Sequence, residues 1–99
     1  HLPLVSVAAE ALVVVSALRR HTTMTFRGLV SDAANTLVVV ARFLALLELY
    51  KEGSVRFEQI MALGELQITW TGATEGVVTV SDEFDRAPIL EKDEGSSDV

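Results

Sequence analysis

Cysteine is absent from this sequence of 99 residues, which excludes disulfide scaffolds and thiolate metal sites. Long hydrophobic runs are also absent. The longest, residues 37–50, has 14 residues and contains Arg42, whereas a membrane span needs about 20 apolar residues. The N-terminus lacks the basic stretch, apolar segment and small-residue cleavage site of a signal peptide. We therefore expect a soluble, cytoplasmic protein that makes no contact with a membrane.

Side chains that carry catalysis are scarce. Apart from the first residue, His21 is the only histidine, and no serine or carboxylate pair near it has the spacing of a triad or a metal site. The glycines do not form a phosphate-binding loop, and no Gly-Lys-Ser/Thr occurs. We expect no enzymatic activity, no catalytic or metal-binding residues and no cofactor.

The net charge of −6 is confined to the C-terminal part of the chain. Residues 1–72 carry six basic and six acidic side chains, whereas residues 73–99 carry two basic and eight acidic ones. Hydrophobic residues make up 49% of the sequence, which is enough for the core of one small domain. We therefore expect a folded domain over residues 1–72. The acidic tail over 73–99 is expected to be disordered, apart from a possible short edge strand at 77–80.

The hydrophobic pattern predicts two helices separated by a short extended segment. Apolar residues at helical spacing indicate a first helix with Ser6 as its N-cap, Glu10 in its first turn and an end near Arg20. Residues 21–25 are rich in β-branched side chains and are predicted to form a turn and a stub of strand. Thr25 is the expected N-cap of a short second helix over residues 26–34.

A third helix and a hairpin follow. Asn35 or Thr36 is expected to cap a helix that runs to Glu52 and ends at Gly53. Residues 54–60 and 66–71 then alternate with a period of two, which is typical of paired strands. This element order predicts an α+β fold of the winged helix class, with three helices and a two-stranded β-hairpin wing.

The third helix is poorly suited to reading DNA. Between Thr36 and Glu52 it has 12 apolar residues, with Arg42 and Lys51 as its only cations. A helix in the major groove needs Arg, Lys, Asn or Gln to reach base edges and phosphates. Its apolar residues instead fall into two stripes, and a helix that is apolar on several sides must be covered on more than one of them.

The two stripes are assigned different roles. The first, expected to pack on the first two helices, contains Leu37, Ala41 and Leu44. The second, about 100° or more away, contains Val40, Phe43, Leu47 and Tyr50. Two interpretations of the second stripe stay open. Either the hairpin covers it through Phe57 and Trp70, or part of it is a docking surface for another protein.

Three segments together have the appearance of a known signature: Arg42-Phe43-Leu44-Ala45-Leu46-Leu47-Glu48-Leu49, Val55-Arg56-Phe57-Glu58-Gln59 and Gly64-Glu65-Leu66. The sequence resembles the kleisins and is similar, over about residues 5–72, to the C-terminal winged helix domain of bacterial segregation and condensation protein A (ScpA). The turn has Gly-Glu-Leu where the family more often has Gly-Asp-Ile, which is a conservative difference.

The resemblance implies a function. It implies a non-catalytic subunit of the condensin-like SMC–ScpA–ScpB complex, whose C-terminal domain docks on the SMC ATPase head and closes a ring for chromosome condensation and segregation. It also implies that ScpB binds through a region absent from this chain, that DNA is contacted indirectly through the complex, and that the protein is associated with the nucleoid. Carried over by position, the family's contacts fall on Phe43, Leu47 and Gln59, and Val40 and Tyr50 share the same stripe.

Two other functions compete with this one. A winged helix transcription regulator that binds DNA would use Arg19, Arg20 and Arg27, although these also suit solvated helix ends. A dimerisation module would pair the second stripe with a second copy, so the isolated domain is expected to show some tendency to form a homodimer.

Overall fold

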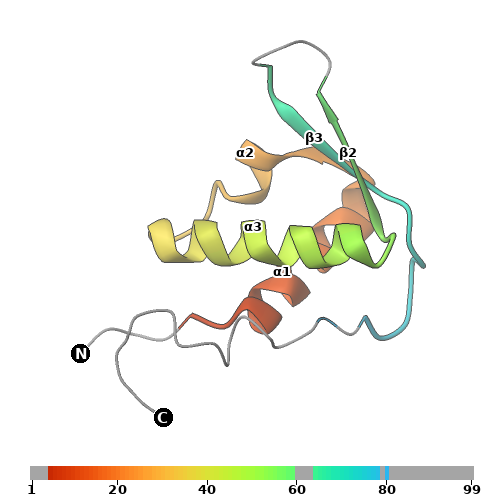
Figure 1. The fold of residues 1–99 in the computed structure, drawn as a ribbon, viewed down its shortest axis with the longest axis horizontal. Coiled ribbons are helices and arrows are strands. Elements are labelled where there is room, and N and C mark those ends of the chain that lie inside the picture. The colour runs from red at the N-terminus through yellow and green to blue at the C-terminus, as the bar shows by residue number, and fades with distance from the viewer. Residues whose placement is uncertain (1–4, 60–63, 79, 81–99) are drawn as a thin grey trace.

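The structure is a computed structural model that describes residues 5–59, 64–78 and 80 (Figure 1). The described residues form three helices and three strands, in the order α1 (Val7–His21), β1 (Thr23–Thr25), α2 (Phe26–Leu29), α3 (Thr36–Lys51), β2 (Val55–Gln59) and β3 (Leu66–Trp70). The predicted α+β winged helix class is confirmed. None of the helices in this part of the chain has the length and apolar character needed to cross a membrane.

The sheet has one strand more than the predicted two-stranded wing. Its order is β1-β3-β2 with both pairings antiparallel, so the segment expected to be a strand stub joins the hairpin. Thr23 lies opposite Thr69, and their hydroxyl groups are 3.1 Å apart. The pairing of β1 with β3 was not predicted, because a segment of three residues carries no periodic signal. β1 pairs because β3 has an edge that β2 does not occupy.

Thr22 makes the junction between α1 and β1. Its backbone φ is 67°, an unusual value for a β-branched residue, because there the side chain crowds the backbone. The N–H of Thr22 donates to the carbonyl of Leu18 at 2.7 Å, and its own carbonyl accepts from the N–H of Trp70 at 2.7 Å. These bonds hold the chain in the sharp turn that brings β1 beside β3.

The predicted helix N-caps are all present. The Ser6 hydroxyl accepts from the N–H of Ala9 at 3.0 Å, and the Thr25 hydroxyl accepts from the N–H of Gly28 at 3.0 Å. Asn35, one of the two candidates for the third cap, accepts from the N–H of Val38 at 3.2 Å. Each side chain satisfies a backbone donor that the first turn of a helix leaves free.

The second helix is shorter than predicted, because it ends at Leu29 and not near residue 34. The hydroxyl of Ser31 donates to the carbonyl of Gly28 at 2.9 Å, and the N–H of Ser31 is bonded to the same carbonyl at 3.3 Å. These local bonds close a turn in place of a further helical turn, as serine side chains commonly do.

The core lies between the helices and one face of the sheet. Its largest fully buried side chains are Val14, Leu18, Leu46, Leu49 and Ile68. A second cluster consists of small residues where α1 packs on α3, namely Val7, Ala11, Ala41 and Ala45. Figure 1 shows the β2–β3 hairpin extending away from the helices, so the core is closed at the base of the hairpin.

The inward side of α3 differs from the first predicted stripe. Ala41 is buried as expected, but Leu37 is 49% exposed and Leu44 is only half-buried. The buried residues of α3 are Ala41, Arg42, Ala45, Leu46, Glu48 and Leu49. The prediction was wrong for Leu37, and the inward side instead includes Arg42 and Glu48, which are buried with partners of opposite charge.

Arg42 connects three parts of the fold. Its side chain is 7% exposed, and its Nε donates to Oε1 of Glu10 in α1 at 2.8 Å. Its Nη1 donates to Oδ1 of Asp32 at 2.6 Å and to the carbonyl of Leu29 at the end of α2 at 2.8 Å. Although burial opposes its charge, the bonds to Asp32 and Glu10 hold the pKa of Arg42 above its ordinary value.

After β3 the chain returns along the helices. Val77, Val78 and Val80 lie in no strand, so the possible edge strand at 77–80 is not formed at these three residues. Val78 and Val80 instead pack against the core. The part of the predicted disordered tail beyond residue 80 lies outside the described residues.

Replacing Arg42 should destabilise the domain strongly. In Arg42→Met the Glu10 carboxylate, 19% exposed, loses its cation, and we expect the free energy of unfolding in urea to fall by about 3 kcal/mol. Arg20→Met, at an exposed position of α1, should change it by less than about 0.5 kcal/mol. Equal effects of the two substitutions would contradict the role given to Arg42.

The Arg42–Asp32 bond should make stability depend on acid pH. The hydrogen bond and the charge of Arg42 lower the pKa of Asp32 from its ordinary 3.8, so the unfolded chain takes up this proton first as the pH falls. The contribution of Asp32 is therefore complete above about pH 4 and lost below it. We expect the difference in Tm between the wild type and Asp32→Asn to shrink between pH 4 and pH 2. A constant difference would argue against this pairing.

Candidate functional site

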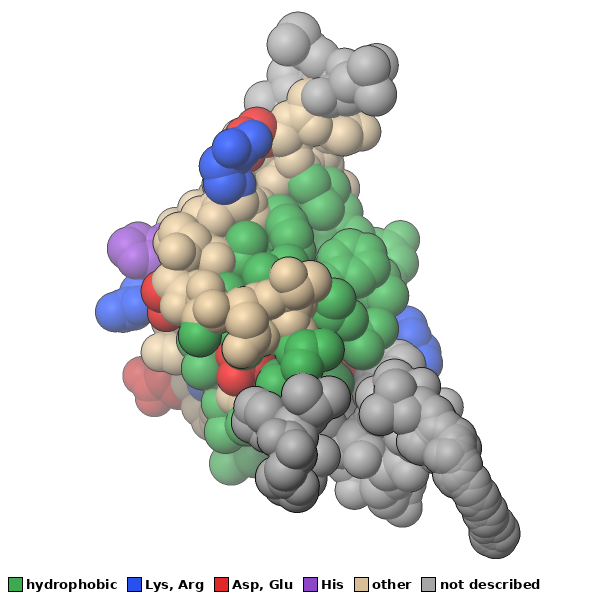
Figure 2. All heavy atoms as spheres, turned by 90° about the vertical axis from the view of Figure 1, so that its left-hand side faces the viewer, with side chains coloured by type: hydrophobic (Ala, Val, Ile, Leu, Met, Phe, Trp, Pro, Cys, Tyr) green, Lys and Arg blue, Asp and Glu red, His purple; other side chains and the backbone are tan. Residues whose placement is uncertain are grey.

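One side of α3 is apolar and open to solvent. Its residues follow the second predicted stripe, and Val40, Phe43 and Tyr50 are 47%, 41% and 55% exposed, while Leu47 is half-buried. We call these four residues the α3 apolar face. Figure 2 shows many hydrophobic side chains near the centre of one side of the molecule. Large apolar side chains that share an exposed patch commonly mark a contact with another protein.

Two aromatic contacts fix the rings of this face. Phe43 meets Phe26 of α2 edge to face, with ring centroids 5.9 Å apart and an interplanar angle of 89°. Tyr50 stacks on Phe57 of β2, with centroids 5.0 Å apart and an angle of 8°. Since both geometries are favourable for aromatic pairs, the exposed rings are held in place before any partner arrives.

The hairpin covers the second stripe only in part. Phe57 lies against Tyr50, as one of the two open interpretations required, but Tyr50 stays more than half exposed. Trp70 is 7% exposed within the core and lies beneath the Arg19 guanidinium, 5.4 Å from its ring centroid. The α3 apolar face is therefore available for contact.

Gln59 is exposed at the end of β2 and is tied to the hairpin itself. Its Nε2 donates to the carbonyl of Gly64 at 2.8 Å, across the segment 60–63 that lies outside the described residues. One of the two N–H donors of its side-chain amide is thus used within the domain. That Phe43, Leu47, Gln59, Val40 and Tyr50 contact a partner stays a prediction.

The arginines considered for DNA binding differ in their partners. Arg19 donates to the carbonyls of Ala73 and Gly76 at 3.0 and 2.8 Å, and Arg27 pairs with Glu65 at 2.9 Å. Arg20 is exposed. On α3 itself, Arg42 is buried and Lys51 pairs with Glu48 at 3.2 Å. Arg27, Arg42 and Lys51 are thus paired with acidic side chains, and Arg19 is bonded to backbone carbonyls.

Two features of the site were missed from the sequence. The Arg42 network has a detectable signal, because one arginine within an apolar run must find an acidic partner once the helix is buried. The contacts of Arg19 have no detectable signal in the sequence, because they are to backbone carbonyls more than fifty residues away. Among the residues described, no group of histidine and acidic side chains could hold a metal ion.

These features define a winged helix whose third helix exposes aromatic and aliphatic side chains and buries its arginine. The sequence model of the family described as segregation and condensation protein ScpA matches residues 3–71. The chain therefore belongs to the ScpA family, and the suspected kinship is confirmed. ScpA proteins are structural kleisins with a role in chromosome segregation and condensation. No curated protein matches the chain.

If the α3 apolar face is surface and not core, truncating it should cost little. We expect Phe43→Ala to lower the free energy of unfolding by about 1 kcal/mol, mainly through its edge contact with Phe26. Leu46→Ala, at a fully buried position on the same helix, should cost about 3 kcal/mol. Urea denaturation measures both, and a loss at Phe43 as large as that at Leu46 would contradict the assignment.

Proposed function

We propose that this domain docks on the ATPase head of an SMC protein through the α3 apolar face, with Gln59 at its rim. Docking would close the ring of an SMC–ScpA–ScpB complex for chromosome condensation and segregation. The observation that carries the proposal is that Val40, Phe43 and Tyr50 remain exposed in a folded domain of the ScpA family.

The chemistry of the face suits an interface core. Such cores are depleted of charge and enriched in aromatic side chains, and Phe43 and Tyr50 supply these here. Both rings are held by partners within the domain, so binding loses little conformational entropy. Apolar area removed from water contributes about 25 cal/mol per Å², which favours docking along the whole stripe.

The other roles follow from the same proposal. The domain is a non-catalytic subunit in the cytoplasm at the nucleoid, and it meets DNA indirectly, through the ring. ScpB would bind another region of the kleisin. A transcription regulator is less well supported, because Arg42 is buried in ion pairs and Lys51 is paired with Glu48.

Without its partner the face has an alternative occupant. A second copy of the domain can cover the same side chains, so the isolated domain is expected to form a weak homodimer. Addition of the SMC head would dissociate it, because the two partners compete for one surface.

The proposal can be tested with two matched substitutions. Val40→Asp on α3 and Val13→Asp on α1 introduce the same charge at positions that are 47% and 44% exposed. In calorimetric titrations of the SMC head from the same organism, we expect Val40→Asp to weaken binding by about thirtyfold, the equivalent of about 2 kcal/mol. Val13→Asp should bind as the wild type does.

Circular dichroism of each variant controls for folding. Equal binding by both variants and the wild type would contradict docking through α3, and no binding by the wild type would contradict the proposed partner. Gln59→Ala adds a finer test. If its amide only closes the hairpin on Gly64, the affinity should change little, whereas a loss similar to that of Val40→Asp would place Gln59 within the contact.

A further inference from the structure

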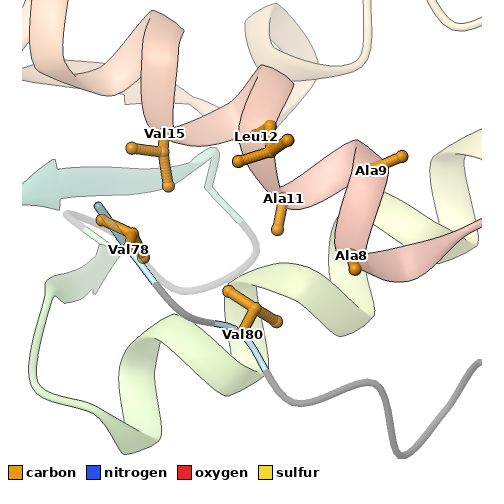
Figure 3. Close-up of a pocket in the computed structure, with 7 residues that line it drawn as sticks. All are labelled: Ala8, Ala9, Ala11, Leu12, Val15, Val78 and Val80. Carbon is orange, nitrogen blue, oxygen red and sulfur yellow. The ribbon is translucent and has the colours of Figure 1, made fainter. Parts of the chain in front are cut away.

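The chain beyond β3 lies along α1, and the two together border an open groove. Val78 and Val80 are both half-buried and line this groove together with Ala8, Ala9, Ala11, Leu12 and Val15 of α1. Figure 3 shows the two valines on the side of α1 from which Ala11 and Val15 project. Val77, next in sequence to Val78, is 95% exposed. The segment therefore has a specific orientation along α1.

Val80 joins the two parts of the core. It packs against the main cluster and also against the small residues between α1 and α3, whereas Val78 packs against the main cluster alone. Ala8, Ala9 and Ala11 of α1 line the open groove together with these two valines. The apolar surface on this side of α1 is covered by the chain's own segment.

Arg19, in the last turn of α1, holds the start of the segment. Its Nε and Nη1 donate to the carbonyls of Ala73 and Gly76, while its guanidinium lies over the ring of Trp70. The indole Nε1 of Trp70 donates to the same Ala73 carbonyl at 2.9 Å. Gly76 has a φ of +100°, which few other residues adopt, and it turns the chain toward the groove.

We propose that residues 73–78 and Val80 form a C-terminal strap that binds the apolar side of α1 through branched side chains at alternating positions. Arg19 is the positioning residue that directs the strap along α1. The strap lies outside residues 3–71, the part of the chain that the family model matches.

The strap is independent of the proposed docking. Val40, Phe43 and Tyr50 keep their exposure while the strap is in place, so a partner on the α3 apolar face does not have to displace it. Failure of the SMC-binding experiment would therefore not contradict the strap. A strap found to be free in solution would likewise not contradict docking through the α3 apolar face.

Single cysteines in the full chain test the strap, because the sequence has no cysteine of its own. Val77→Cys, Val78→Cys and Val80→Cys are labelled with a thiol reagent under native conditions. We expect the thiols at 78 and 80 to react about tenfold more slowly than the one at 77, which corresponds to an opening free energy of about 1.4 kcal/mol. Labelling in urea gives the rate of each unprotected thiol.

Arg19→Ala, added to each cysteine variant, tests the positioning role. It should raise the rates at 78 and 80 toward the rate at 77, which should not change, and Arg19→Lys should restore only part of the protection because it lacks the second donor arm. Equal native rates at the three positions would overturn the strap. Slow rates at 78 and 80 that are unaffected by Arg19→Ala would overturn the role of Arg19. Far-ultraviolet circular dichroism confirms that each variant is folded.

Discussion

The buried guanidinium of Arg42 determines how α3 is oriented. This helix is apolar on several sides, so hydrophobic burial alone allows more than one rotation about its axis. A buried cation removes that freedom, because a rotation that separated Arg42 from its acidic partners would leave an unpaired charge in the core. With Arg42 bonded to Glu10 and Asp32, Ala45, Leu46 and Leu49 point inward and Phe43 points outward. The α3 apolar face is exposed because the opposite side is fixed.

Local chemistry made most of the secondary structure predictable. Cap side chains, the change from helical to alternating periodicity and the glycine after α3 are signals that act over a few residues. Features set by distant partners were missed. The pairing of β1 depends on an edge of β3, and the valines of the strap are covered by a helix that lies more than sixty residues earlier. Leu37 was assigned to the interior by its spacing with Ala41 and Leu44, and spacing does not show that Arg42 and Glu48 are buried.

The candidate site was predictable in its residues but not in its constraints. The spacing of Val40, Phe43, Leu47 and Tyr50 identified a second stripe, and these side chains are at least partly exposed. Spacing could not show that Phe26 and Phe57 hold the rings, or that Gly64 takes up an amide donor of Gln59. Family membership supplies a biological setting for the face, and the structure supplies the reason it is rigid.

The backbone at Thr22 has a consequence for the order of folding. Its positive φ is unfavourable for a threonine and is held on one side by a carbonyl bond to Trp70, which is nearly fifty residues later in the chain. While the ribosome is still synthesising β3, this bond has no donor. The hydrogen bond that closes this junction can therefore form only after Trp70 has emerged.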